Sequence, residues 1–348
     1  MKYNRLGNTD LEVSAICLGS MTWGTQNTEA QAHQQIDCAV AHGVNFIDTA
    51  EMYPTTPLGE DTWGCTEEII GSWIKKGGRN RDMLIATKVT GVGNQPYIHE
   101  GMPICPKKIR RALEGSLQRL QTDCIDLYQL HWPNRGSYHF RQFSGYDASA
   151  QRTAETLDHI REVLFCLQRY IDEGKIRHIG LSNETCWGVM KFLQTAKDNN
   201  LPRVVSVQNE YSLLCRLFDL DLAELAHHEQ VGLLAFSPLA AGLLSGKYAD
   251  GSIPDRSRRT LVNDLNGRLS EYSEPALEGY LQVATKHNLS ASQLALAFCM
   301  QRPFMASTII GATSMPQLEE NLGAAEVQLT DEIKSDIAAV YRRHPVPM

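Results

Sequence analysis

The sequence predicts an α/β fold, a (β/α)8 barrel, and two observations support this prediction. Short, almost continuously apolar runs alternate along the chain with amphipathic stretches of helical length, as expected for parallel strands covered on both faces. Polar or charged residues follow the runs at their carboxyl ends, which is the face where barrel enzymes carry their active sites. Eight such runs, alternating with helices, favour a barrel over a doubly wound sheet.

The expected strands are short and rich in β-branched and large apolar side chains, which suit a buried sheet. They cover residues 15–18, 44–47, 83–87, 125–130, 176–181, 204–207, 231–236 and 307–310. Before the first of them, residues 3–6 and 11–13 flank Gly7 and Asn8. This pattern predicts a β-hairpin that closes the barrel floor.

The expected helices carry recognisable start and stop signals. Asn27 and Thr28 precede the first helix and Gly43 follows it, while Pro106 opens the second. The helix candidates cover residues 29–42, 106–120, 156–173, 184–197, 219–229, 274–287 and 315–325.

No low-complexity segment or Pro/Gly/Ser-rich linker divides the sequence, so residues 1–348 are expected to form one barrel domain. Long loops at the carboxyl-terminal face, residues 90–105, 132–154 and 249–273, should line or cover the pocket. Trp23 and Trp132 in this region suggest an apolar or aromatic substrate, although indole rings at a barrel mouth also simply pack.

Composition limits the function classes. The formal net charge of -7 disfavours nucleic-acid binding, which needs a concentrated positive surface. The N-terminal segment has no signal-peptide core, and the most apolar stretch, residues 231–246, is interrupted by Ser237 and Pro238 and too short to cross a bilayer. The nine cysteines stand singly, as in reduced proteins. We therefore expect a soluble cytoplasmic enzyme without membrane attachment; no pattern predicts an oligomeric state.

Ionisable residues follow three consecutive expected strands. Asp48 follows the second, Lys88 the third and His131 the fourth, and Tyr53 lies on the loop after Asp48. An ion pair between Asp48 and Lys88 across the barrel mouth is geometrically natural. A cation beside a phenol lowers the pKa of the phenol, so Tyr53 could give a proton near neutral pH.

Each of these residues also has a plain structural interpretation. Asp48 and Lys88 could form a structural ion pair, Tyr53 could be a surface tyrosine, and His131 could be a hydrogen-bonded core histidine. The histidines and cysteines lack zinc-ligand spacing, and no G-x-S-x-G elbow is present, so neither a zinc site nor a serine nucleophile is expected.

Longer motifs carry a specific resemblance. Residues 43–53 read G-V-N-F-I-D-T-A-E-M-Y, I-A-T-K ends at Lys88, and D-L-Y-Q-L-H-W-P contains His131. The later blocks are G-K-I-R-H-I-G-L-S-N, V-Q-N-E-Y-S-L-L, A-F-S-P-L-A-A-G-L-L-S-G-K-Y and I-I-G-A-T-S-M-P-Q-L-E-E-N. In this order, over nearly the whole chain, the sequence resembles the aldo-keto reductase superfamily. Potassium-channel β subunits share the later blocks.

The resemblance implies a reaction and roles for four residues. NADPH would donate a hydride to the carbonyl carbon of a small molecule while Tyr53 protonates the developing alkoxide. Lys88, positioned by Asp48, would tune Tyr53, and His131 would orient the carbonyl oxygen. No metal would take part.

The resemblance also implies cofactor contacts, of a kind other than the G-x-G-x-x-G fingerprint, which is absent. The residues expected at the nicotinamide are Ser182, Asn183 and Gln208 for the carboxamide and Phe236 for ring stacking. The residues expected at the pyrophosphate are Ser237, Pro238, Leu239 and Lys247. The residues expected around the adenosine end are Gly311, Thr313, Gln317, Glu320 and Asn321, with Arg258 at the adenine or the 2'-phosphate.

The sequence departs from the family pattern at three positions. Pro54 replaces a common glycine and could reshape the pocket wall, and Thr66 replaces a serine, with little expected effect. Gln317 stands where some members use arginine for the 2'-phosphate, so the expected NADP preference rests on Lys247 and Arg258.

Two other functions stay open from the sequence. The chain could be a sensing subunit that holds NADPH and turns over slowly, which a burst without sustained turnover would reveal. It could also be a barrel isomerase or aldolase that uses Lys88 as a Schiff-base nucleophile, which borohydride trapping would reveal.

Overall fold

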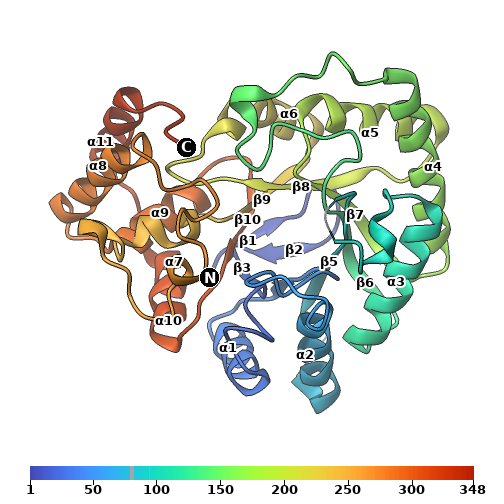
Figure 1. Cartoon of the computed structure of the whole chain (residues 1–348), viewed down its shortest axis with the longest axis horizontal. Helices are drawn as coiled ribbons and strands as arrows, with labels where there is room; N and C mark the ends of the chain where they lie inside the picture. The colour runs from blue at the N-terminus through green and yellow to red at the C-terminus, as the bar shows by residue number, and fades with distance from the viewer. Residues whose placement is uncertain (79–81, 94) are drawn as a thin grey trace.

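The computed structural model, which describes residues 1–78, 82–93 and 95–348, contains the predicted barrel at its centre, surrounded by helices (Figure 1). Strand β10 pairs with β3, with Thr308 opposite Ile16, and this pairing closes the sheet. The parallel barrel strands are β3 (Ile16–Gly19), β4 (Phe46–Asp48), β5 (Leu84–Val89), β6 (Ile125–Leu130), β7 (Ile176–Ser182), β8 (Val204–Glu210), β9 (Gly232–Phe236) and β10 (Met305–Ile310). The (β/α)8 prediction is confirmed.

The strands are apolar on both faces because both faces are covered. Strands β5, β6, β8 and β10 are buried at every residue. Their outward side chains join the core between sheet and helices, and their inward side chains pack inside the barrel. This double burial explains why the sequence shows continuous apolar runs without alternation.

The predicted hairpin also forms. Strands β1 (Tyr3–Arg5) and β2 (Glu12–Ser14) pair antiparallel. Leu6, Leu11 and Val13 pack against side chains from inside the barrel, so the hairpin closes the floor as expected. Gly7 turns with φ +60° against the Val205 carbonyl oxygen, a place where a Cβ atom would clash.

The seven predicted helices are present with small shifts at their ends. Thr28 and Gln31 form a capping box at the start of α1, and Pro106 is the first residue of α3. These helices are α1 (Glu29–Ala41), α3 (Pro106–Leu120), α4 (Thr153–Asp172), α5 (Cys186–Asn199), α6 (Asp221–Glu229), α8 (Ser273–Lys286) and α10 (Met315–Gly323).

Four observed helices were not among the predicted ones: α2 (Cys65–Trp73), α7 (Arg258–Leu261), α9 (Ala291–Met300) and α11 (Asp331–Arg343). Helix α2 follows Gly64, which provides no side-chain cap. Helix α9 is buried almost all round, so its apolar residues show no helical periodicity. Helix α11 did carry the usual signals, a Thr330 cap and apolar residues at Ile333, Ile337 and Val340.

We propose that the whole chain is one domain. The barrel closes through residues near both ends of the sequence, Ile16 and Thr308, so a fragment that lacks either half would leave open strand edges. Among the described residues, none of the helices combines the length and the apolar character that a membrane crossing requires.

The contact between α2 and α3 yields a stability prediction. A Cβ atom at Gly71 would collide with the Arg119 carbonyl oxygen of α3, whereas one at the exposed Gly145 would meet nothing within 4 Å. We expect Gly71→Ala to lower the free energy of unfolding by roughly 1–3 kcal/mol through overpacking, reduced by the better helix propensity of alanine.

Thermal and denaturant unfolding of both variants measures this effect, and Gly145→Ala serves as the matched control that should stay close to wild type. A Gly71→Ala protein as stable as the control would show that the two helices separate at no cost.

Candidate active site

Three of the predicted ionisable residues meet at the carboxyl ends of the strands. The Lys88 ammonium on β5 lies 2.7 Å from Asp48 Oδ2 at the end of β4 and 3.3 Å from the Tyr53 hydroxyl oxygen. It also donates to the Thr49 carbonyl oxygen at 2.7 Å. With Lys88 fully buried and Asp48 2% exposed, these contacts use all three ammonium protons.

Gln129, which the sequence analysis missed, completes the hydrogen bonding of Asp48. The second carboxylate oxygen of Asp48, Oδ1, accepts from Gln208 Nε2 at 2.8 Å and from Gln129 Nε2 at 3.2 Å. Gln129 stands two residues before His131, on the face of β6 that also carries Leu127 inside the barrel. The strand period was therefore a signal that could have found it.

Lys88 stays charged in this environment. Burial lowers the pKa of Lys88, but the neighbouring Asp48 carboxylate and the Tyr53 hydroxyl raise it by more, so the pKa lies above its usual value. An ammonium with a raised pKa is a poor nucleophile, because the lone pair that would attack a carbonyl carries a proton.

The expected pKa of Tyr53 needs a correction. Lys88 and Arg258 lower the pKa of Tyr53 as anticipated, but burial, the largest effect, and the Asp48 charge raise it. The net pKa lies above the usual value, so the expectation of a net lowering by the neighbouring cation is wrong, while the role of Tyr53 as proton donor stays a prediction. Tyr53 instead keeps its proton throughout the neutral range.

His131 is the fourth predicted residue, and it lies beside the other three. Its ring packs edge-on against Tyr53 with 6.0 Å between centroids and lies 4.9 Å from the Trp132 ring. Burial and the charges of Lys88 and Lys108 hold the pKa of His131 well below its usual value, so the imidazole is neutral. Within the described ranges its Nδ1 atom has no hydrogen-bond partner.

The residues expected at the nicotinamide lie next to this cluster. Ser182 donates to the Gln208 carbonyl oxygen at 2.9 Å, and Asn183 donates to the His131 carbonyl oxygen at 3.0 Å. The side-chain oxygen of Asn183 is buried, and no described residue donates to it. Such an orphaned acceptor fits the amide N–H of a carboxamide. Phe236, half-buried at the end of β9, is paired with Glu210 of β8, the strand that also carries Gln208.

The segment expected at the pyrophosphate has an unusual backbone. Ser237 has φ +52°, and Gly242 and Gly246 follow with φ +97° and +77°. Left-handed residues of this kind turn backbone N–H groups to one side, which suits an anion. The Lys247 ammonium lies 5.1 Å over the Tyr248 ring and forms no ion pair with any described carboxylate. Pro238 and Leu239 continue the turn from Ser237.

The adenosine-end residues gather around the start of α10. A Cβ atom at Gly311 would meet open space, and Thr313 donates to Gln317 through both its N–H (3.0 Å) and its hydroxyl (3.1 Å). Asn321 donates to the Gly311 carbonyl oxygen at 3.4 Å. Glu320 differs from the rest, because its carboxylate accepts from Ser290 at the start of α9.

The charge of Arg258 acts on the site that Asp48, Tyr53, Lys88 and His131 form. One guanidinium nitrogen lies 3.9 Å from Met21 Sδ, and its charge lowers the pKa of Tyr53. Burial and the neighbouring Arg268 lower the pKa of Arg258 itself to about 10. The Arg258 side chain is half-buried, and no described residue accepts a hydrogen bond from its Nε.

The apolar surface beside Tyr53 differs from the one expected. Trp23 is fully buried in the main core, where its indole N–H donates to Gln35 at 2.9 Å, so it does not line the pocket. Trp132 does contribute. The side chains that cluster with Tyr53 are Ala50, Met52, Trp63, Tyr97, Ile98 and Trp132. Residue 94 of the expected pocket loop lies outside the described residues.

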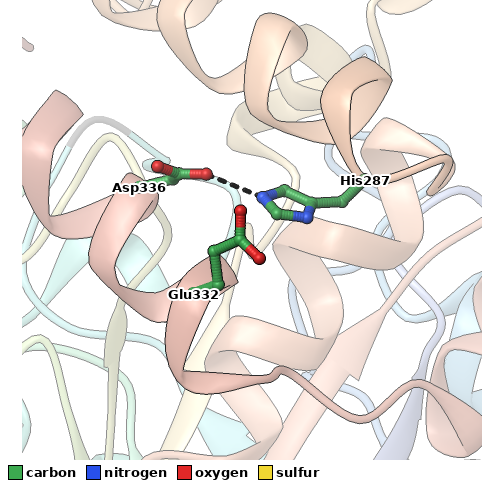
Figure 2. A group of neighbouring side chains, drawn as sticks. All are labelled: His287, Glu332 and Asp336. Atoms are coloured by element: carbon green, nitrogen blue, oxygen red, sulfur yellow. Dashed lines mark hydrogen bonds and ion pairs between the residues drawn. The ribbon is translucent and has the colours of Figure 1, made fainter.

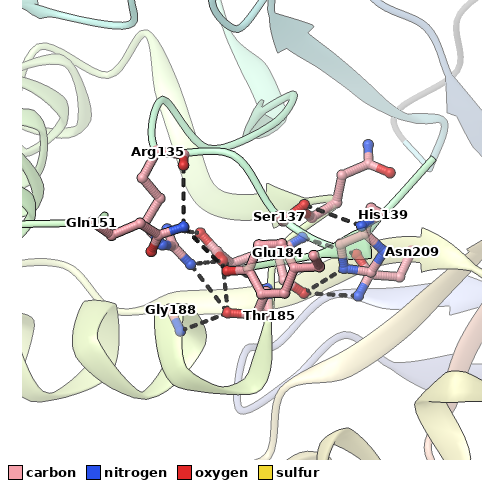
Figure 3. A network of polar contacts seen from close by, with 10 residues as sticks. Arg135, Ser137, His139, Gln151, Glu184, Thr185, Gly188 and Asn209 are labelled. Carbon is pink, nitrogen blue, oxygen red and sulfur yellow. Dashed lines mark hydrogen bonds and ion pairs between the residues drawn. The ribbon is translucent and has the colours of Figure 1, made fainter. Parts of the chain in front are cut away.

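The loop after β6 is fixed by a buried polar network (Figure 3). Arg135 pairs with the Glu184 carboxylate through its two terminal nitrogens, Nη1 and Nη2. His139 Nε2 lies 3.0 Å from the Glu184 carbonyl oxygen. A cavity of about 730 Å³ lies under this loop, between Trp132 and His159. Its lining includes Leu130, Trp132 and Ser182 but not Tyr53, Lys88 or His131, so it is separate from the site that these three residues form.

Among the described residues, one group has donors that could hold a metal ion: His287, Glu332 and Asp336, which join α8 to α11 (Figure 2). The Lys286 ammonium lies 2.7 Å from Asp336 and 3.1 Å from Glu332. His287 also pairs with Asp336 at 2.7 Å. Because the Lys286 ammonium already pairs with both carboxylates, we interpret the group as an ion-pair network between two helices.

Comparisons with known proteins agree with the geometry. The model of the aldo/keto reductase family matches residues 15–342. The chain is 44% identical over 349 residues to "Protein tas" of Escherichia coli, covering 100% of this chain and 99% of the relative. It is 32% identical to "Uncharacterized oxidoreductase YrpG" of Bacillus subtilis (96% and 94% covered) and 35% identical to "Aldo-keto reductase" of Babesia bovis (74% and 95%).

The environment of His131 yields a prediction on pH. Because its pKa is depressed, the ring should stay neutral from about pH 9 down to about pH 6, where an ordinary histidine already gains charge. NMR titration of the imidazole resonances, assigned with His131→Gln, should show no midpoint in this range. A His131 midpoint near 6.5 would mean that burial and Lys88 do not control the ring.

Proposed function

Because the chain belongs to the aldo/keto reductase family, we propose that it reduces the carbonyl group of a small aldehyde or ketone with NADPH, using Tyr53 as general acid. The family supports an oxidoreductase with a nicotinamide cofactor. The single observation that carries the finer proposal is the hydrogen-bonded chain from Tyr53 through Lys88 to Asp48.

The residues present fit this cofactor. When bound, NADPH supplies a hydride, which is a proton with two electrons, to the carbonyl carbon. Ser182, Asn183 and Gln208 would hold the carboxamide, since the free acceptor of Asn183 can take an amide N–H. Phe236 would support the ring, and the turn from Ser237 to Leu239 with Lys247 would hold the pyrophosphate. Gly311, Thr313, Gln317 and Asn321 would surround the adenosine end.

Tyr53 provides the proton that balances the reaction. As the new C–H bond forms, the π electrons of the carbonyl bond move to its oxygen, which takes the Tyr53 hydroxyl proton. A raised pKa does not prevent this step, because an alkoxide is a far stronger base than a phenolate. Lys88, 3.3 Å away, stabilises the phenolate that remains, and Asp48 keeps Lys88 protonated.

His131 would act on the carbonyl oxygen without competing for the proton transfer. A neutral imidazole can donate an N–H to the oxygen and so orient it and stabilise its developing charge. Since the pKa of His131 is depressed, the ring is not a source of acid at neutral pH. Tyr53 is therefore the proton donor that the electrostatics favour.

A Schiff-base mechanism fits the site less well. It would need Lys88 as a free amine, but the Asp48 carboxylate at 2.7 Å and the raised pKa keep it an ammonium. Irreversible trapping of a carbonyl substrate on Lys88 by borohydride would favour that mechanism over hydride transfer.

The first test removes the proton donor. Tyr53→Phe should leave folding and NADPH affinity nearly intact and should lower turnover of a good aldehyde about 10²–10⁴-fold, or roughly 3–5 kcal/mol in the barrier. Tyr128→Phe is the matched control, because this buried β6 tyrosine loses a hydroxyl that has no partner among the described residues.

Turnover is followed by NADPH absorbance with a panel of aldehydes and ketones. If Tyr53→Phe retains more than about a tenth of wild-type turnover, the general-acid assignment is wrong, because this loss is far below that of a positioned acid. The proton would then come from His131 or from water.

The second test concerns the cofactor. We expect NADPH to bind more tightly than NADH, as the family resemblance implies, with Arg258 as the candidate partner of the 2'-phosphate that only NADPH carries. Arg258→Ala should therefore weaken NADPH binding about 10–100-fold, the loss of a charge-assisted hydrogen bond, and NADH binding much less.

Fluorescence quenching measures both affinities. A loss of equal size for both cofactors would show that Arg258 does not bind the 2'-phosphate. Equal wild-type affinities for NADPH and NADH would contradict the NADP preference itself.

A further inference from the structure

Gln129 is a buried glutamine that the proposed mechanism does not use. Its side chain is fully buried inside the barrel, above the apolar lower layer that contains Leu127 of the same strand. Burying a primary amide costs free energy unless both its ends are hydrogen-bonded. Gln129 meets that condition only through the site, because its Nε2 donates to Asp48 Oδ1 at 3.2 Å and its Oε1 accepts from Gln208 at 3.3 Å.

The two carboxylate oxygens of Asp48 accept hydrogen bonds from different partners. Oδ2 accepts from Lys88, and Oδ1 accepts from the Gln129 and Gln208 amides. Amide donors on Oδ1 fix the rotation of the carboxylate about its side-chain bond, so Oδ2 stays aligned with the ammonium. They also draw negative charge toward Oδ1, away from Tyr53 on the other side of Lys88.

Gln129 also contacts a residue expected at the nicotinamide. The Gln208 amide group donates both to Asp48 and to Gln129, so the orientation of Gln208 depends on the same two partners. One set of hydrogen bonds thus connects the carboxamide side of the site with the proton-donor side.

We propose that Gln129 is a positioning residue that holds the Asp48 carboxylate in the orientation needed by Lys88 and thereby governs the acidity of Tyr53. The proposal rests on the proposed function for its kinetic consequence. Gln129 itself does not reach the reacting atoms; it acts through Asp48.

The decisive variant is Gln129→Met, which keeps the length of the side chain and removes both hydrogen bonds. With one donor fewer on Asp48, more of its charge bears on Tyr53, and that charge raises the pKa of the phenol. We expect kcat/KM to fall about tenfold, as for the loss of one hydrogen bond, and its alkaline limb to move up by about half a pH unit or more.

Gln129→Glu tests the sign of the same interaction. The introduced carboxylate faces Asp48 Oδ1 and repels it, so activity at about pH 8 should be below that of Gln129→Met. Protonation of the introduced carboxyl restores a donor, and activity should therefore recover toward wild type as the pH falls to about 6.

Gln35→Met is the matched control. Gln35 is equally a buried glutamine with two hydrogen bonds, one from Trp23 at 2.9 Å and one to the Ala312 carbonyl oxygen at 3.2 Å. It should lose stability like Gln129→Met, measured by thermal unfolding, and keep the wild-type pH profile.

A Gln129→Met enzyme with the wild-type pH profile, whatever its stability, would overturn the proposal and leave Gln129 a packing residue. If the wild type reduces no carbonyl compound, the proposed function fails instead. In that case NMR titration of ¹³Cζ-labelled tyrosine still decides the question, because the Tyr53 midpoint must rise in Gln129→Met and stay unchanged in Gln35→Met.

Discussion

A single buried cation determines the design of this site. Lys88 is fully enclosed at the carboxyl end of β5, and an ammonium ion is expensive to bury unless every proton finds an acceptor. The acceptors are Asp48 Oδ2, the Thr49 carbonyl oxygen and the Tyr53 hydroxyl, all from the end of β4 and the loop that follows it. The pairing of β4 with β5, which aligns Asp48 with Ala86, brings the two strand ends to this distance. The ion pair therefore depends on the register of the barrel strands.

The same burial gives the two uncharged groups their roles. Burial raises the pKa of Tyr53 and lowers the pKa of His131, so Tyr53 keeps its proton and His131 stays neutral. Among Asp48, Tyr53, Lys88 and His131, the two charged residues are Lys88 and Asp48, and their charges neutralise each other. A proton can then leave Tyr53 only toward a strong base that develops next to it, which is what a carbonyl oxygen becomes during hydride transfer.

Much of this arrangement was predictable from the sequence, for a physical reason. Continuous burial makes each barrel strand an apolar run, and the residue after the run marks the face of the barrel where it ends, which located Asp48, Lys88 and His131. Features that depend on three-dimensional surroundings were not predictable. Trp23 looked like a pocket residue but packs in the core, and the net pKa of Tyr53 follows burial more than charge. The strand period places Gln129 on the inward face of β6, but the apolar run around it gives no local signal that Asp48 is its partner.

In the proposed mechanism Lys88 acts through Tyr53, and a double-mutant cycle on carbonyl reduction tests this claim most directly. Turnover would be measured for Lys88→Met, Tyr53→Phe and the double variant, with thermal unfolding to show that each remains folded. Groups that act as one unit are strongly non-additive. We predict that Lys88→Met lowers turnover sharply in the wild type and has little further effect in the Tyr53→Phe protein. Losses that multiply independently in the double variant would contradict the account, because Lys88 would then serve the reaction without Tyr53.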